Sequence, residues 1–185
     1  MQCVNVALET VDVKHIYKTQ TIANNASSLP WNQNMEFPSA RQRISRESML
    51  MAVAQIVSLR GTCQRARVGA VLSRDGRILS VGYVGSPPGS AHCIDVGCQI
   101  ENDGCIRTQH AEANAVAWAA RSGVSTEGST LFVTHSPCLS CAKVLIAAGV
   151  SKVYYAEPYR LAYGLSLLES SGVETVHLEE SRHVV

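Results

Sequence analysis

The pattern of apolar and polar residues changes near position 45. Before it, residues 1–40 contain a polar, turn-prone stretch over 23–30 and show no sustained period. We interpret them as an N-terminal extension with one short strand near 4–8. From 45 onwards, apolar residues recur every three to four positions, which predicts a helix over 45–59 with one buried face.

A β-hairpin signal follows this helix. The apolar runs 68–72 and 78–83 flank a turn that contains Asp75 and Gly76, and Asp-Gly between apolar runs favours a tight hairpin. Prolines and glycine at 87–89 then break the pattern, so 86–109 is predicted to be a long loop. A loop of this length inside a compact domain is usually functional or held by a ligand.

The rest of the chain alternates between helical and strand patterns. We expect helices over 110–121, 138–148 and 161–170, and strands over 130–134, 152–156 and 173–177. A helix, a hairpin and then alternating helices and strands predict an α/β fold. We therefore expect a three-layer α/β/α sandwich around a five-stranded mixed sheet.

Composition narrows the class of protein. Hydrophobic residues make up 46% of the 185 residues and charged residues 17%, which is typical of a domain with a buried core. The formal net charge of +1 favours neither a polyanion nor a membrane partner. No apolar run of about 18 residues and no secretory signal pattern is present. We expect a cytoplasmic protein with one domain over 41–185 and no membrane association.

Three residues form a candidate zinc site. Seven cysteines in such a chain indicate metal binding or catalysis rather than disulfides. His110 opens one predicted helix, and Cys138 and Cys141 open the next. At a helix start the two thiols share a face, and the helix dipole favours their thiolate forms. Three ligands leave a fourth position for water, as in a catalytic zinc site.

Glu112 stands two positions after His110, beside the candidate site but outside its ligand set. His-x-Glu with Pro-Cys-x-x-Cys is the known signature of zinc deaminases. In such an enzyme, zinc lowers the pKa of a water towards ~7, so that the water can attack the C4 carbon of cytosine. We expect Glu112 to move a proton to N3 and then to the departing ammonia. The alternative, a surface histidine and two unrelated buried cysteines, does not explain why both motifs open helices.

Between about 45 and 160 the chain resembles the deoxycytidylate deaminase family. The segments that carry the resemblance are Val68 to Val71, Gly82 to Pro87, His110 to Ala115, Gly128 to Thr134 and Ser136 to Lys143. The resemblance implies a cytidine deaminase-like fold and the conversion of dCMP to dUMP. Family members are commonly homohexamers that dCTP activates and dTTP inhibits, which implies the same assembly and effectors here.

The resemblance also implies roles for single residues. The backbone N–H of Ala111 would hold the base O2, and the backbone carbonyl of Ser136 the exocyclic amine. Tyr159 stands where the family often brings an aromatic ring near the nucleotide, although a half-buried core tyrosine explains it equally well. Arg121 matches an arginine that the family places near the subunit interface and the regulatory apparatus.

One segment departs from the family. The chain has Val84 before Gly85, where the family usually has asparagine. Valine offers the sugar or an effector neither a donor nor an acceptor. Regulation through Val84 and Gly85 is therefore in question, and a modified substrate such as a 5-substituted dCMP, or another cytosine nucleotide, is an alternative.

Two other classes of function share parts of the pattern. The tRNA adenosine deaminases also carry His-Ala-Glu and Pro-Cys-x-x-Cys, but they tend to have a basic surface, and this chain is almost neutral. A catalytically inactive zinc module is the other alternative. Glu112 argues against it, because an inactive site has no use for a proton carrier.

A second group of cysteines crowds the predicted loop. Some dCMP deaminases hold a structural zinc at positions that match Cys63 and Cys93, and Cys98 and Cys105 would complete four thiolates. The alternatives are free thiols, or His92 in place of one cysteine.

Arginines are unevenly distributed along the chain. Eight of the twelve fall within 41–77, where most belong on a solvated face and a minority would meet a substrate phosphate. We therefore expect a nucleoside monophosphate to be preferred over the free nucleoside.

Overall fold

The computed structural model describes residues 43–102 and 104–178, so the predicted extension over 1–40 lies outside the described part of the chain. Helix α1 (Arg46–Ser58) begins at the N-cap Ser45, whose hydroxyl accepts the backbone N–H of Ser48 at 2.9 Å. Such a cap satisfies one of the free N–H groups at a helix start. The predicted first helix is thus confirmed, with a start within one residue of the expected one.

The sheet has five strands in the order β2-β1-β5-β6-β7. These are β1 (Gly69–Arg74), β2 (Arg77–Tyr83), β5 (Thr130–His135), β6 (Lys152–Glu157) and β7 (Glu174–His177). β1 is antiparallel to both β2 and β5, whereas β5, β6 and β7 are parallel. The predicted mixed five-stranded sheet is therefore confirmed.

The β1–β2 connection is the two-residue turn that the sequence predicts. Asp75 and Gly76 have φ of 54° and 74°. Positive φ at both central residues is the type I′ geometry that matches the twist of a hairpin.

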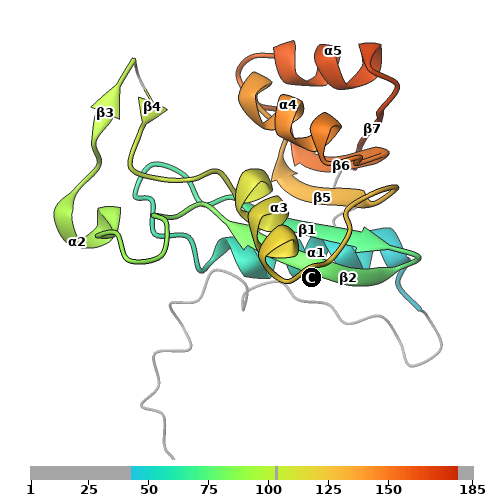
Figure 1. The fold of residues 1–185 in the computed structure, drawn as a ribbon, viewed down its shortest axis with the longest axis horizontal. Coiled ribbons are helices and arrows are strands. Elements are labelled where there is room, and N and C mark those ends of the chain that lie inside the picture. The colour runs from blue at the N-terminus through green and yellow to red at the C-terminus, as the bar shows by residue number, and fades with distance from the viewer. Residues whose placement is uncertain (1–42, 103, 179–185) are drawn as a thin grey trace, which may run out of the picture. The chain divides into compact units, whose positions relative to one another are not determined.

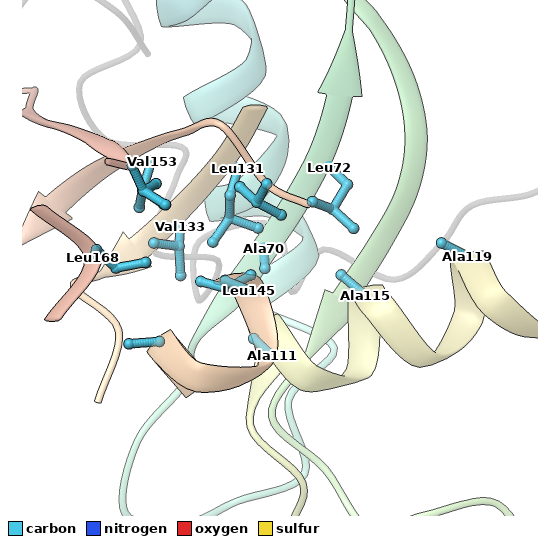
Figure 2. Packing of buried hydrophobic residues seen from close by; sticks show 13 residues of the cluster. Ala70, Leu72, Ala111, Ala115, Ala119, Leu131, Val133, Leu145, Val153 and Leu168 are labelled. Atoms are coloured by element: carbon cyan, nitrogen blue, oxygen red, sulfur yellow. The ribbon is translucent and has the colours of Figure 1, made fainter. Parts of the chain in front are cut away.

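Helices cover both faces of the sheet (Figure 1). One face packs against α3 (Ala111–Arg121), α4 (Leu139–Ala147) and α5 (Tyr163–Ser170). The other face packs against α1. Because side chains alternate along a strand, neighbouring residues of β5 belong to different cores. Leu131 and Val133 face the α3–α5 side, shown in Figure 2, and Phe132 faces α1.

The predicted loop over 86–109 has structure of its own. It contains the short helix α2 (Cys93–Val96) and a small hairpin of β3 (Ile100–Glu101) and β4 (Gly104–Cys105). A β-bridge between Gly85 and Gln109 joins the two ends of this insertion. The two ends of the insertion therefore lie next to each other, and its second end directly precedes His110.

Two glycines allow the site-bearing helices to approach closely. A Cβ on Gly82 of β2 would lie 2.2 Å from the Ala111 carbonyl oxygen at the start of α3. A Cβ on Gly164 of α5 would lie 2.0 Å from the carbonyl oxygen of Pro137, just before α4. Both contacts fix the N-terminus of a helix that carries zinc-site residues.

Across residues 43–102 and 104–178, the helices all lack the length and apolar character that a bilayer-crossing segment needs.

Candidate metal centre and active site

Two helix N-termini meet at the predicted zinc site. His110 is the N-cap residue of α3, and Cys138 is the N-cap residue of α4. His110 Nδ1 lies 3.5 Å from Cys138 Sγ and 3.4 Å from Cys141 Sγ. The three ligand atoms all lie within 4.8 Å of one another. The structure therefore brings the three residues together as the motif spacing predicts.

The donor set fits zinc. A hydrogen bond from Cys141, together with His110, lowers the pKa of Cys138 to about 3 despite its burial. The hydrogen bond with Cys138 raises the pKa of His110. Two sulfur ligands and one imidazole nitrogen at this separation match the borderline-soft Zn²⁺ ion. Three protein ligands correspond to a catalytic rather than a closed structural site.

Glu112 lies at the first turn of α3 with its side chain 4% exposed. Burial raises the pKa of its carboxyl group, and its hydrogen bond with Cys141 opposes that shift. A buried carboxyl group with a raised pKa is a better proton donor than an ionised, acceptor-only carboxylate at the surface, because it keeps its proton to a higher pH. Glu112 is thus buried beside the three candidate metal ligands, with a carboxyl pKa above its ordinary value.

These groups lie in a pocket of about 270 Å³. Its lining contains the predicted residues His110, Ala111, Glu112, Ser136, Cys138 and Tyr159. Ser136 and Tyr159 are joined directly, because Ser136 Oγ accepts the Tyr159 backbone N–H at 2.7 Å. A pocket of this size is at the lower end for small-molecule sites.

The pocket also contains charged and polar residues that the motifs did not single out. Arg65 and Arg160 both line it, and so does His135 at the end of β5. Arg65 belongs to the predicted arginine-rich segment, but Arg160 lies far from it in sequence. Arg160 stacks its guanidinium 5.7 Å from the centroid of the Tyr159 ring. The resemblance to the deaminase family ends near 160, so Arg160 belongs to none of the motifs that could have singled it out.

The residues predicted to take part in regulation fall in different places. Val84 is 5% exposed and forms part of the pocket wall. Its backbone N–H donates to Val68 O, and its carbonyl accepts the N–H of Thr62. Gly85 pairs with Gln109 at the base of the insertion. Arg121 lies at the other end of α3 from the metal ligands, 5.0 Å from the centroid of the Trp118 ring.

Three of the four cysteines of the second group come together. The Sγ atoms of Cys93, Cys98 and Cys105 lie within 4.8 Å of one another, with 3.6 Å between Cys93 and Cys105. Although burial raises the pKa of Cys105, the backbone N–H groups of Arg107 and Gln99 lower it to about 7. Backbone N–H donors of this kind favour the thiolate that a metal requires.

Cys63 is not brought into this thiol cluster. It follows α1, is 7% exposed and lines the active-site pocket, as Cys105 of the cluster also does. His92 directly precedes Cys93 in the chain, so its imidazole is a further candidate ligand. Within the described ranges, its Nδ1 is a buried atom without a hydrogen-bond partner.

Comparison with known proteins identifies the family. Residues 44–157 match the cytidine and deoxycytidylate deaminase zinc-binding region. The chain belongs to this deaminase family. Membership confirms the predicted enzyme class, a zinc-dependent hydrolase that deaminates a cytosine-type base.

Several relatives of the deaminase family cover most of the described domain. ComE operon protein 2 of Bacillus subtilis (strain 168) is 45% identical over 142 residues, 75% of each chain. The deoxycytidylate deaminase of Enterobacteria phage T4 is 32% identical over 152 residues, which are 62% of this chain and 79% of that one. The crystal structure of dCMP deaminase from the cyanophage S-TIM5 in complex with dCMP and dUMP superposes with a TM-score of 0.67. It is 37% identical and covers 74% of this chain and 99% of its own. The similarity confirms the cytidine deaminase-like fold.

Proposed function

We propose that the protein deaminates dCMP, with water as co-substrate and dUMP and ammonia as products. The observation that carries the proposal is that Glu112 shares one pocket with His110 and Cys138 and hydrogen-bonds Cys141, the third member of the candidate metal group. The phage relatives named as deoxycytidylate deaminases support dCMP as the substrate.

In the proposed mechanism, zinc held by His110, Cys138 and Cys141 supplies the Lewis acidity that makes a water nucleophilic at neutral pH. The backbone N–H of Ala111 holds the base O2, and the Ser136 carbonyl orients the exocyclic amine. Glu112 accepts a proton from the attacking water and passes it to N3; it then takes the remaining proton from the new C4 hydroxyl and delivers it to the amine, which leaves as ammonia while the C4 carbonyl forms. Each of these three residues lines the pocket, which supports the assignment.

The proposed preference for a monophosphate depends on the pocket arginines. Arg65 and Arg160 offer guanidinium groups that form charge-assisted hydrogen bonds with phosphate oxygens. Tyr159, between Arg160 and Ser136, is proposed as a substrate contact. In this proposal the phosphate contacts Arg65, which belongs to the predicted arginine-rich segment, and Arg160, which follows β6.

The decisive assay measures ammonia release from dCMP, deoxycytidine, CMP, dCTP and 5-methyl-dCMP by the purified protein. We expect kcat/KM to be highest for dCMP. Comparable values for deoxycytidine and dCMP would contradict the nucleotide assignment. A preference for 5-methyl-dCMP would favour the modified-substrate alternative that Val84 raises, and deamination of a tRNA would favour the editing alternative.

We further propose a second, structural zinc at Cys93, Cys98 and Cys105. The close sulfur atoms and the N–H donors around Cys105 support this site. Cys63 and His92 are the candidates for a fourth ligand. The buried, unpartnered Nδ1 of His92 and its place beside Cys93 in the chain favour the histidine. Thiol ligands stay reduced in the cytoplasm, which is the compartment that we propose.

The assembly is proposed from the resemblance alone. We propose a homohexamer that responds to dCTP and dTTP through the region of Val84, Gly85 and Arg121. The burial of Val84 in the pocket wall places this residue, though not Arg121, beside the substrate site. Light scattering with and without dCTP measures the assembly. Rates of dCMP turnover with dCTP and with dTTP measure the regulation.

A further inference from the structure

His135 is a pocket residue to which the proposed mechanism gives no task. It is the last residue of β5, is partly buried and lines the same pocket as Glu112. Its Nδ1 lies 3.2 Å from the hydroxyl oxygen of Thr134. That hydroxyl oxygen also accepts the backbone N–H of Gly69, at 3.3 Å. A chain of hydrogen bonds therefore runs from β1 to the imidazole.

This chain of hydrogen bonds indicates which ring nitrogen carries the proton. Thr134 is 7% exposed, and its hydroxyl hydrogen needs an acceptor because an unmet buried donor is costly. Within the described part of the chain, His135 Nδ1 is the acceptor that the structure offers this hydrogen. An Nδ1 that accepts is unprotonated, so the neutral ring carries its proton on Nε2.

The second ring nitrogen is then a donor for the pocket. Nδ1 is hydrogen-bonded to the Thr134 hydroxyl, so Nε2 can donate to a molecule bound in the pocket that His135 lines. The donor needs an acceptor on the substrate. Cytosine in a nucleotide has two acceptors, O2 and N3, and the proposed mechanism assigns them to Ala111 and Glu112. The remaining acceptors are oxygens of the sugar and the phosphate.

We propose that His135 is a substrate-binding residue whose Nε2–H donates to a phosphate oxygen or to the 3′-oxygen of the nucleotide. The proposal rests on the proposed function, because it takes the base contacts from that mechanism. His135 thus joins Arg65 and Arg160 in recognising the non-reacting part of the substrate. Binding energy from that part sets specificity and positions the reacting carbon.

The kinetic test compares His135→Leu and His135→Gln with the wild type. Leucine removes the donor, whereas glutamine restores an N–H at nearly the same reach. We expect His135→Leu to lower kcat/KM for dCMP about tenfold, mainly through KM, the size of one hydrogen bond, and His135→Gln to recover part of the loss. Both variants should keep the wild-type zinc content and circular dichroism spectrum.

Two further substrates locate the accepting oxygen. If a phosphate oxygen accepts, deoxycytidine turnover is insensitive to His135→Leu. If the 3′-oxygen accepts, turnover of 2′,3′-dideoxycytidine monophosphate is the insensitive one. Either result supports the proposal. Wild-type turnover of dCMP by His135→Leu, or an equal loss on all three substrates, would overturn it.

A second measurement is independent of the nucleotide that is turned over. Nitrogen-15 NMR of histidine-labelled protein at mildly alkaline pH should show His135 with a protonated Nε2 and an unprotonated Nδ1. Thr134→Val removes the hydroxyl that donates to Nδ1 and should weaken this tautomer preference. A His135 ring protonated on Nδ1 would overturn the inference even if dCMP is the substrate. A wild type inactive on dCMP would instead defeat the proposed function and leave the tautomer result standing.

Discussion

At the scale of single residues, the Glu112 side chain combines burial with a place beside the metal ligands. Glutamine has nearly the same shape but cannot carry the proton. We expect Glu112→Gln to lower kcat for dCMP by ~10²–10⁴, the usual contribution of positioned proton transfer, with zinc content unchanged. Kinetics and metal analysis on the same preparation check this.

The matched control is Glu169→Gln on α5. Glu169 is exposed and accepts a hydrogen bond from Thr175, which glutamine can still accept through its carbonyl oxygen. The activity of the Glu169→Gln variant should equal that of the wild type. Activity of Glu112→Gln within about tenfold of the wild type would remove Glu112 from the proposed role.

Residues in short local motifs could be predicted from the sequence, and residues placed by tertiary contacts could not. The sequence predicts His110, Cys138 and Cys141 as ligands, because the spacing of ligands at a helix start is a local property of the chain. Arg160 and His135 reach the pocket only because β5 and β6 lie parallel, with His135 opposite Glu157. Cys63 was predicted as a ligand of the second group; it lies outside the cluster of three thiols and lines the pocket, and its role as a ligand stays a prediction.

At the scale of elements, the insertion of α2, β3 and β4 offers a direct test of the second metal. Cys98→Ser should lower zinc from two ions per chain to one and increase hydrogen exchange between 86 and 109, because one thiolate of the cluster is lost. Metal analysis with exchange mass spectrometry measures both.

Cys63→Ser is the matched comparison, because Cys63 stands outside the thiol cluster. If His92 is the fourth ligand, Cys63→Ser keeps two zinc ions and His92→Ala loses one. The reverse pattern would make Cys63 the ligand. One zinc ion per wild-type chain would contradict the structural site altogether.

Helix α5 supports the catalytic site through Gly164. An alanine Cβ there would lie 2.0 Å from the Pro137 carbonyl oxygen, which is backbone and cannot turn aside. Alanine gains ~1 kcal/mol in helix propensity, but overpacking typically costs ~1–3 kcal/mol and occasionally more. We expect the clash to prevail, so that Gly164→Ala lowers both the free energy of unfolding and the affinity for zinc.

Denaturant unfolding and competition with a zinc-binding dye measure these two effects. Ser166→Ala, two positions further along α5 and with only a local hydrogen bond to Ala162, should change neither. A Gly164→Ala variant with unchanged zinc affinity would show that α5 does not hold the Pro137 segment in place.

Long periodic elements were predictable from their pattern, and the short ones in the insertion were not. The final helix was expected over 161–170 and spans Tyr163–Ser170. By contrast, β3 and β4 have two residues each, which is too short for any period. The pairing of β3 with β4 depends on the bridge between Gly85 and Gln109 and on the thiol cluster. Both are tertiary contacts, which a pattern of apolar residues does not show.

At the scale of the whole described domain, two cores share one sheet. Leu131 is fully buried in the core beneath α3, α4 and α5 (Figure 2). We expect Leu131→Ala to lower the free energy of unfolding by ~2–5 kcal/mol, because a cavity forms between the sheet and the helices. Chemical denaturation measures the change.

Ile56 on α1 is the exposed control, with 59% of its surface accessible. Ile56→Ala should change the free energy of unfolding by no more than ~0.5 kcal/mol. A larger effect than that of Leu131→Ala would mean that α1 is covered by something outside the described residues.

The contact between Gly164 and Pro137 has a consequence for the way the protein is made. Synthesis from the N-terminus adds His110, Cys138 and Cys141 to the chain before α5, the helix that packs against the segment preceding Cys138. A nascent chain that ends after α4 therefore exposes all three ligands without the support that fixes their geometry. A transcript cut short after α4 yields a chain that has all three candidate ligands but lacks the helix that packs against the Pro137 carbonyl.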